Sequence, residues 1–288
     1  MEPRLEAFEA QRPRLKRLAY RMLGSVAEAE DVVQDAWLRW TRAGEDVADP
    51  AGWLVRATSR LCIDRLRSAK AQREAYRGPW LPEPLIEDLT EDPVERAEEV
   101  SVAFLLALER LSPLERAVFL LHDVFDQDYD AVAETLGRNE AAVRQLASRA
   151  RAHVRDARPR FSVSQDEVAK LAGAFMAAVT RGDMAAISAV LAEDAVMVTD
   201  GGGKRPSALR AMVGPADIIR LLEGIAWRSK TVWDGEFRPA RINGYPGLIL
   251  ELADGPMTVA FEPGEDGKLV GVYLMRNPDK LGHVTQGV

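Results

Sequence analysis

The chain of 288 residues has a single cysteine, Cys62, and only three histidines. One thiol excludes an intrachain disulfide framework and is typical of a protein kept in a reducing cytoplasm. His122, His153 and His283 lie far apart without the spacing of metal ligands, so we expect no metal and no other cofactor. No uninterrupted apolar run could span a bilayer, and the charged first residues do not resemble a signal peptide. The sequence therefore favours a protein without membrane contact.

Positive charge is not in excess either. The formal net charge is −7 and the isoelectric point is near 5.3, which argues against binding of polyanions through bulk charge. Basic residues are therefore informative only where they cluster. At this length we expect about two or three domains.

Residues 128–158 predict a helix, a turn and a longer helix, because Gly137 can end the first helix and Asn139 can cap the second. The first helix has a short apolar face made of Ala131, Val132 and Leu136. The second has a buried stripe made of Val143, Leu146, Ala147, Ala150 and Val154. Basic and polar side chains on this second helix are Arg144, Ser148, Arg149, Arg151 and Arg155.

An arginine-lined second helix fits the major groove of DNA, where arginine pairs with guanine edges or phosphates. Short helix-turn-helix patterns are degenerate, so a solvated cationic face on an ordinary helical hairpin remains the alternative. The rest of the chain has to decide between them.

The first segment, to about Arg77, is helical by pattern, and Ser25 with Glu28 can form a capping box. Residues 27–40 place an apolar side, made of Val32, Val33, Ala36, Trp37 and Trp40, toward a core. The opposite side carries Asp31, Gln34, Asp35 and Leu38. A leucine among acids on an outer face indicates a partner surface, although a solvated face with one stray leucine is the simpler alternative.

The next predicted helix combines basic residues with an aromatic residue on one face: Trp53, Arg56, Arg60 and Arg67. Capture of a DNA strand needs this combination, because phosphates attract positive charge and unstacked bases need a flat surface. In the alternative, Trp53 belongs to the core and the arginines are solvated.

Residues 79–98 change composition sharply, with four prolines and a run of acids that prevent a continuous helix. A flexible acidic linker explains the second half of this segment. It does not explain the apolar residues Trp80, Leu81, Leu85 and Ile86, which we expect to dock on another surface.

From Phe161 the pattern predicts two helices separated at Gly182, then short strands, with one more helix before the last four strands. Helices followed by a curved antiparallel sheet predict an α+β cone. Its concave, apolar interior could hold a small molecule. Asp194 and Asp200 are possible catalytic carboxylates, but loop and turn positions explain both, so we expect no enzyme activity.

Residues 27–40, 49–67 and 111–154 together resemble the extracytoplasmic-function (ECF) sigma factors of bacterial RNA polymerase. The resemblance implies a multidomain chain with two all-α domains, sigma region 2 in residues 1–78 and sigma region 4 in residues 99–160. Asp31, Gln34 and Asp35 then match the segment that holds the polymerase clamp, which would explain the exposed Leu38. The loop before Trp53 and the helix after it match the element that melts the minus-ten DNA. The helix-turn-helix becomes the minus-thirty-five reader.

Residues 163–288 resemble the SnoaL-like branch of the nuclear-transport-factor-two-like (NTF2-like) superfamily. Three motifs resemble a sigma-factor group in which this domain is fused to the chain and replaces a separate anti-sigma protein. The first motif includes Trp80, Leu81, Pro82 and Glu83, the second is Asp200, Gly201, Gly202, Gly203 and Lys204, and the third is Asn277, Pro278, Asp279, Lys280 and Leu281. In that group the motifs mark the regulatory contact between domains. We expect Lys204 to face Glu83 there.

The favoured function is thus a sigma factor that binds the clamp region of core RNA polymerase and promoter DNA, regulated in cis by its C-terminal domain. A ligand-responsive helix-turn-helix regulator is one alternative, but it leaves residues 27–67 unexplained. A SnoaL-type isomerase or cyclase with a DNA-binding module is another, and it lacks a convincing acid–base constellation. The Gly-rich motif lacks the spacing of a phosphate-binding loop.

Overall fold

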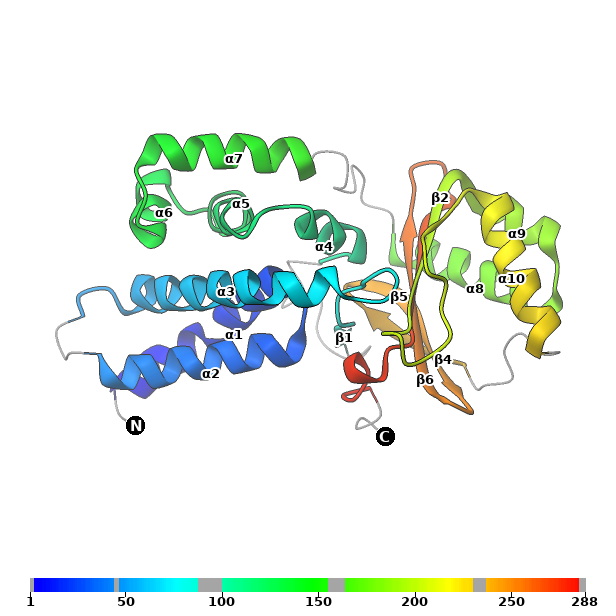
Figure 1. Cartoon of the computed structure of the whole chain (residues 1–288), viewed down its shortest axis with the longest axis horizontal. Helices are drawn as coiled ribbons and strands as arrows, with labels where there is room; N and C mark the ends of the chain where they lie inside the picture. Colours follow the sequence, from blue (N-terminus) through cyan, green and yellow to red (C-terminus); the bar gives the residue numbers. More distant parts are fainter. Residues whose placement is uncertain (1–2, 44–46, 88–99, 155–163, 230–236, 285–288) are drawn as a thin grey trace. The chain divides into compact units, whose positions relative to one another are not determined.

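The computed structural model describes residues 3–43, 47–87, 100–154, 164–229 and 237–284 (Figure 1). Contacts along the chain divide it into two compact units. The first unit combines Met1–Glu74 with Phe104–Ala157, and the second combines Ala75–Ala103 with Arg158–Val288. Among the described residues, no helix has the length and apolar character needed to cross a membrane.

The regular elements among the described residues of the first unit are all helices. Its first three helices are α1 (Pro3–Leu23), α2 (Val26–Arg42) and α3 (Pro50–Glu74). They are followed by α4 (Val102–Glu109), α5 (Pro113–Phe119), the π-helix η2 (Leu120–Val124), α6 (Tyr129–Leu136) and α7 (Glu140–Val154). Ser25 caps α2 by accepting a hydrogen bond from the backbone N–H of Glu28 at 3.2 Å, as predicted. The predicted apolar side of α2 is buried, except for the half-buried Trp37.

The helix-turn-helix forms as predicted, because Gly137 adopts the left-handed conformation with a φ of 62° and ends α6. Asn139 caps α7 by accepting from the backbone N–H of Ala142 at 2.8 Å. The apolar stripe of α7 is buried, with Leu146 half-buried.

The predicted apolar face of α6 is partly wrong. Val132 is buried and Leu136 is half-buried, but Ala131 is exposed. Ala133 and Thr135 are buried with Val132. The buried residues Val132, Ala133 and Thr135 centre on a direction roughly 110° around the helix from Ala131, so Ala131 falls outside the packed face.

In its described residues, the second unit combines a sheet with helices. Its helices are α8 (Gln165–Arg181), α9 (Met184–Val190) and α10 (Pro215–Ser229). Its strands are β1 (Ile86–Glu87), β2 (Leu191–Asp200), β3 (Met212–Val213), β4 (Phe237–Ile242), β5 (Tyr245–Leu252), β6 (Gly255–Pro263) and β7 (Leu269–Met275), followed by the 3-10 helix η4 (Pro278–Lys280). The strand order is β1-β4-β5-β6-β7-β2-β3. This is the predicted α+β cone.

One pairing corrects the prediction of an antiparallel sheet, because β2 and β7 pair in parallel, with Asp200 opposite Met275. Parallel neighbours need a long connection, and here α10 and the strands from β3 to β6 intervene. The sheet is therefore mixed. As a result, the C-terminal ends of β2 and β7 meet at the same edge, followed by Gly201 and Arg276 respectively.

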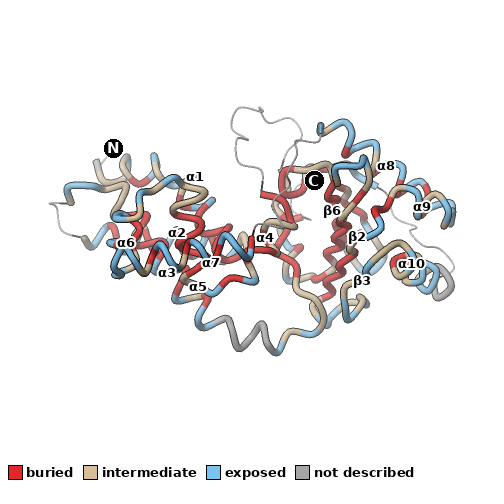
Figure 2. Tube along the Cα trace, turned by 90° about the horizontal axis from the view of Figure 1, so that it is seen from above, coloured by how far each residue is buried: buried red, intermediate tan, exposed pale blue. Residues whose placement is uncertain are grey.

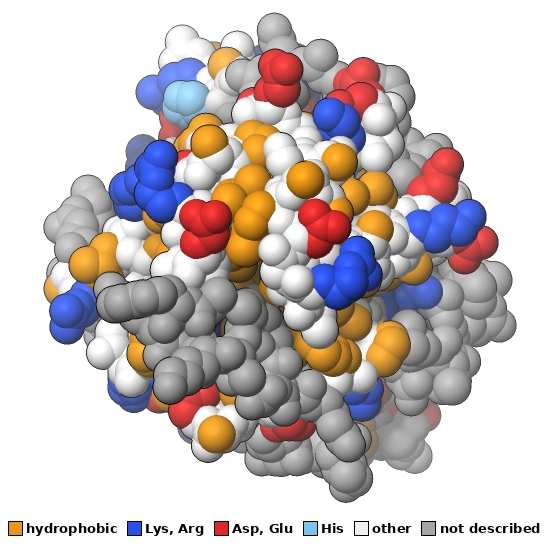
Figure 3. Space-filling model, turned by 90° about the vertical axis from the view of Figure 1, so that its right-hand side faces the viewer, with side chains coloured by type: hydrophobic (Ala, Val, Ile, Leu, Met, Phe, Trp, Pro, Cys, Tyr) orange, Lys and Arg blue, Asp and Glu red, His pale blue; other side chains and the backbone are white. Residues whose placement is uncertain are grey.

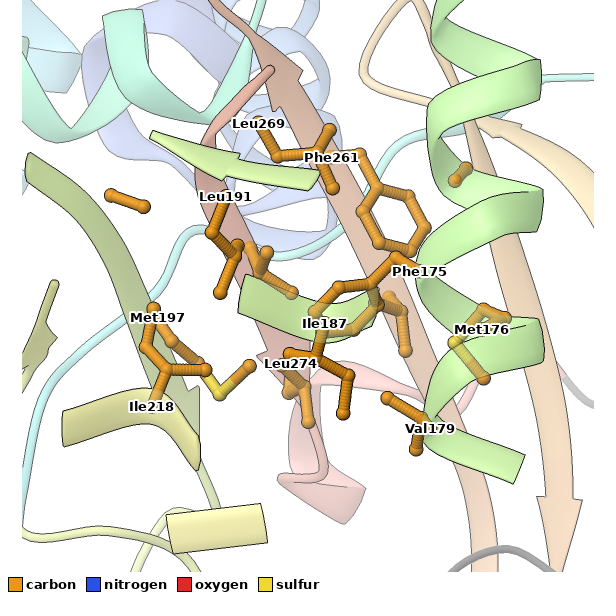
Figure 4. Packing of buried hydrophobic residues seen from close by; sticks show 14 of the residues in the cluster. Phe175, Met176, Val179, Ile187, Leu191, Met197, Ile218, Phe261, Leu269 and Leu274 are labelled. Carbon is orange, nitrogen blue, oxygen red and sulfur yellow. The ribbon is translucent and has the colours of Figure 1, made fainter. Parts of the chain in front are cut away.

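The interior of the cone is filled by large apolar side chains (Figure 4). Phe175 on α8 meets Phe261 on β6 edge-to-face, with ring centres 5.8 Å apart. Ile187 on α9 and Leu274 on β7 lie in the same cluster. Strands β6 and β2 are red, that is buried, along most of their length in Figure 2. Each large apolar side chain buried here contributes about 1.5–3 kcal/mol, so the cone has a real core.

The segment after α3 belongs to this sheet. Ile86 and Glu87 form the edge strand β1, antiparallel to β4, with Ile86 opposite Ile242. Next to this pairing, the backbone N–H of Asn243 donates to Leu85 O at 2.9 Å, and Leu85 N–H donates to Asn243 Oδ1 at 3.3 Å. Two residues are too short for a periodic pattern, so the sequence did not predict this strand.

Candidate regulatory site and DNA-facing surfaces

The carboxylate of Asp200, at the end of β2, is fully buried and accepts four hydrogen bonds. Its Oδ1 accepts from the Tyr76 hydroxyl at 2.6 Å and the Gly202 N–H at 2.9 Å. Its Oδ2 accepts from the Leu81 N–H at 2.9 Å and from Lys280 Nζ at 2.8 Å. We call these five residues the Asp200 clasp. It joins residues from all three motifs that the sequence singled out, and it adds Tyr76.

Lys280, on η4, completes the clasp from the C-terminal side. Its ammonium group donates to Leu81 O at 2.6 Å as well as to Asp200, and it lies 4.3 Å from the ring centre of Trp80. The side chain of Lys280 is 15% exposed, while that of Asp200 is 0% exposed. A buried ion pair is tolerated only when its members are well hydrogen-bonded, which holds for this pair.

Tyr76 and Asn277 extend the clasp. Asn277 Nδ2 donates to the Tyr76 hydroxyl oxygen at 2.9 Å, and Asn277 Oδ1 accepts from the backbone N–H of Asp279 at 3.0 Å. Burial, together with the hydrogen bond to Asp200, raises the pKa of Tyr76 well above its ordinary value. The phenol is therefore a neutral donor. The role of Tyr76 was missed, because nothing in its sequence neighbourhood distinguishes it from a surface tyrosine.

Steric constraints explain why glycine occupies positions 202 and 203 of the second motif. Gly202 has a φ of 63°, and a Cβ at this position would overlap the side chain of Asn277. Gly203, with a φ of 70°, lies against the side chain of Arg77. A residue with a side chain would be strained at these φ values and at Gly202 would also collide.

The expected contact between Lys204 and Glu83 is wrong. Lys204 is exposed and pairs with Asp279 at 2.6 Å, because the glycine turn directs it toward η4. Glu83 is buried and lies 3.3 Å from His283 Nδ1. His283 Nε2 also lies 2.9 Å from Pro84 O, so the residues after η4 contact the linker too.

The remaining motif residues lie around the clasp. Leu81, Pro82, Gly201 and Leu281 are buried, Trp80 and Pro278 are half-buried, and Gly203 and Asp279 are exposed. The apolar start of the linker is thus docked, as predicted, and the surface that it contacts belongs to the second unit.

The predicted polymerase-facing surface lies on α2. Asp31, Gln34 and Leu38 are exposed there, Leu38 by 45%, and Asp35 is half-buried. Arg65 on α3 lies 3.4 Å from Asp31 Oδ2 and 3.3 Å from Asp35 Oδ2. Only the packing of α2 against α3 reveals this arginine as a neighbour of the acidic surface.

The predicted minus-ten residues lie on α3, but two of them face α6. Arg60 Nε donates to Thr135 O at 3.2 Å, and Arg56 lies 3.5 Å from Glu134. Trp53 is half-buried against Trp40, with ring centres 5.3 Å apart, while the exposed Arg67 lies 3.7 Å from Asp64.

The predicted minus-thirty-five residues Arg144, Ser148, Arg149 and Arg151 are all exposed on α7. The three arginines lie close to carboxylates: Arg144 to Glu140, Arg149 to Glu115 and Arg151 to Asp123. Arg155 falls outside the described residues.

Two carboxylates outside the clasp have different environments. Asp194 is exposed on β2. Glu262 on β6 is 5% exposed, and burial raises its pKa to about 7, although hydrogen bonds from Ser101 and the Ala103 N–H oppose this rise. Sequence reasoning missed Glu262, because a carboxylate in a strand ordinarily faces solvent. Among the described residues, no cluster of three or more potential metal ligands is present.

These helical elements match two protein families, Sigma-70 region 2 over residues 7–72 and Sigma-70 region 4 over residues 101–154. The chain is 40% identical to the ECF RNA polymerase sigma factor SigJ of Mycobacterium tuberculosis, over 95% of this chain and 92% of SigJ. The chain belongs to the ECF sigma factors of RNA polymerase.

Two further relatives agree with this assignment. The probable ECF RNA polymerase sigma factor SigI of the same species is 36% identical over 76% of this chain and 80% of SigI. The crystal structure of M. tuberculosis SigJ superimposes with a TM-score of 0.80 at 38% identity, and the match covers 96% of this chain and 98% of that one. Because the likeness extends over nearly the whole chain, it includes the C-terminal cone as well as the sigma regions.

Proposed function

We propose that this sigma factor binds core RNA polymerase and promoter DNA through its helical unit and is regulated in cis by the Asp200 clasp. The observation that carries the proposal is the buried Asp200 carboxylate, which binds Tyr76 just before the linker, Leu81 within the linker, and Lys280 from the C-terminal motif. The linker connects α3 to α4, so its conformation affects both predicted DNA-binding surfaces.

Chain length supports a role for the clasp in this connection. Residues 75–101 separate α3 from α4, and these 27 residues would reach about 90 Å when fully extended. While residues 76–87 are docked on the cone by the clasp and by β1, they cannot contribute to that reach. Releasing the clasp would therefore greatly increase the distance that regions 2 and 4 can span.

We propose that region 2 and region 4 separate when they bind a promoter. The names of the two promoter elements place them about 25 base pairs apart, or about 85 Å along the DNA. In the first unit, Arg60 on the minus-ten helix and Thr135 on α6 are hydrogen-bonded at 3.2 Å. One arrangement of the two regions cannot satisfy both the promoter spacing and this hydrogen bond. We therefore propose that the bond between Arg60 and Thr135 belongs to a resting state of the protein.

The exposed surface of α2 is the proposed binding site for the polymerase clamp. Leu38 offers an apolar contact, and Asp31 and Gln34 around it offer polar ones. Because Asp31 and Asp35 already lie close to Arg65, a partner with basic residues would compete with a weak, partly solvated pair.

We propose that the cone acts without catalysis. The exposed Asp194 has no acid–base partner among its described contacts, and Asp200 is occupied by the clasp. Binding of a small molecule in the cone stays a prediction. Phe175, Phe261 and their neighbours occupy its interior, so a ligand would have to displace them. Figure 3 shows apolar side chains gathered between charged ones on one outer face.

Run-off transcription with core polymerase tests the proposal, using a promoter that the wild-type holoenzyme selects from a library. Asp200→Asn and Lys280→Met should change transcript yield in the same direction, because each releases the same linker. Asp217→Asn is the matched control. Asp217 forms an ion pair with Arg210, with a distance of 2.6 Å between their nearest atoms, and neither residue belongs to the clasp. Unchanged yield in both clasp variants would contradict regulation in cis. Failure of the wild-type chain to copurify with core polymerase would contradict the initiation role itself.

A further inference from the structure

Tyr129, the first residue of α6, contacts both outer arginines of the α7 surface. Arg144 Cζ lies 4.3 Å from the centre of the Tyr129 ring. Arg151 Nη2 donates to the Tyr129 hydroxyl at 3.0 Å. The two arginines are seven residues apart, which places them on one face of α7 about 10 Å from each other. A single side chain from a neighbouring helix thus bridges two turns of the predicted reading helix.

The Tyr129 ring is itself fixed. The His122 ring lies with its centre 3.8 Å from that of Tyr129, at an interplanar angle of 30°. Two groups this close to one ring centre cannot share a face, so the tyrosine lies between His122 and Arg144. His122 Nδ1 lies 2.6 Å from Gln127 O, which holds the imidazole in place.

Carboxylates complete the placement of the arginines. Asp123 Oδ1 accepts from Arg151 Nε at 2.6 Å, and Glu140 Oε1 accepts from Arg144 Nε at 2.9 Å. A guanidinium group has five N–H donors in a rigid plane, so two bonds set its direction. The side chains of Arg144 and Arg151 are nevertheless 59% and 43% exposed. They are anchored from one side and accessible from the other.

We propose that Tyr129 is a positioning residue for minus-thirty-five recognition, which rests on the proposed function of α7 as the DNA reader. By fixing Arg144 and Arg151 before DNA arrives, the tyrosine reduces the conformational entropy that these long side chains lose on binding. The side chain of Tyr129 touches the arginines, and the arginines touch the DNA. Its contribution is therefore to affinity for the correct sequence and not to the fold of α7.

The test uses holoenzyme made from the full chain, with a duplex that the wild-type protein selects from a randomised minus-thirty-five library and a scrambled duplex, at one salt concentration. Tyr129→Phe keeps the ring under Arg144 but loses the bond to Arg151, and it should lower the ratio of matched to scrambled affinity about two- to fivefold. Tyr129→Leu removes both contacts and should lower the ratio about tenfold. Tyr245→Phe, on β5 in the second unit, is the control that should leave the ratio unchanged.

A double-mutant cycle separates the inference from the function on which it rests. If Tyr129 acts through Arg151, then Tyr129→Phe should have almost no further effect in an Arg151→Ala background. Loss of specificity in Arg144→Ala and Arg151→Ala, with an unchanged ratio in both Tyr129 variants, would overturn the positioning role and leave the reader intact. An unchanged ratio in the arginine variants would instead overturn the assignment of α7. Equal losses on matched and scrambled duplexes, with a lower urea midpoint, would show a purely structural tyrosine.

Discussion

Asp200→Ala provides the sharpest test of the clasp. The substitution removes the shared acceptor of four donors, from Tyr76, Leu81, Gly202 and Lys280. Lys280 is 15% exposed and would lose its carboxylate partner. Breaking a buried ion pair from one side typically costs about 3–5 kcal/mol. Loss of the neutral hydrogen bonds adds to this, so we expect the docked linker to be destabilised by at least about 3 kcal/mol.

Hydrogen exchange of the Leu81 amide measures this loss directly, because that N–H donates to Asp200 at 2.9 Å. A loss of about 3 kcal/mol corresponds to an exchange rate more than about a hundredfold faster, provided that exchange occurs through local opening. Amides in the core of α8, such as that of Phe175, should keep their protection, because the clasp does not contribute to this packing.

The double variant Asp200→Leu with Lys280→Met is the matched control. Replacing both members of a buried pair by apolar residues leaves no uncompensated charge and is often neutral or stabilising. The Leu81 amide should therefore exchange its hydrogen more slowly in the double variant than in Asp200→Ala. If the Leu81 amide keeps its wild-type protection in Asp200→Ala, the ion pair does not hold the linker. The same conclusion follows if this amide exchanges as fast in the double variant as in the single one.

Three further predictions concern separate parts of the chain. Folding raises the pKa of Glu262 from 4.5 to about 7, so the native protein holds this proton more tightly than the unfolded chain does. The free energy of unfolding should therefore fall by about 3 kcal/mol as the pH rises from 4.5 past 7. Urea titrations of Glu262→Gln should lack this fall, and parallel pH profiles for the two proteins would disprove the prediction. Gln34→Ala with Asp35→Arg should weaken binding to core polymerase without altering the circular dichroism spectrum, whereas unchanged affinity would mean that α2 presents only a solvated surface. Gly202→Val should loosen the linker by about 1–3 kcal/mol, because it combines a strained positive φ with a collision at Asn277, and limited proteolysis should cleave the variant faster in the linker than the wild type.

Local signals in the sequence were sufficient for most of the secondary structure. The caps at Ser25 and Asn139 and the left-handed glycines at Gly137 and Gly182 all act within a few residues, so they could be predicted without the fold. The apolar start of the linker was recognised as a docking segment for the same reason, since four large apolar residues do not belong in a solvated tether.

Contacts between distant segments could not be derived in this way. The parallel pairing of β2 with β7 brings Asp200 to the edge where residues 276–281 follow, and this depends on strand order and not on any local pattern. Lys204 therefore pairs with Asp279 and not with Glu83, although the sequence allowed either. Long side chains reach whichever partner the backbone brings near, and the tertiary structure alone decides that.

The amino-acid sequence by itself determined the helix-turn-helix and the cone, because hydrophobic periodicity, caps and turn residues are local properties of the chain. The class of the protein followed from the resemblance of three segments to a known family. The tertiary structure decided that Tyr76 joins the clasp, that Arg60 is bonded to α6 and that Tyr129 bridges Arg144 and Arg151. The physical reason is that hydrogen bonds and ion pairs act over about 3–4 Å, so which residues form them depends on how segments far apart in sequence pack together.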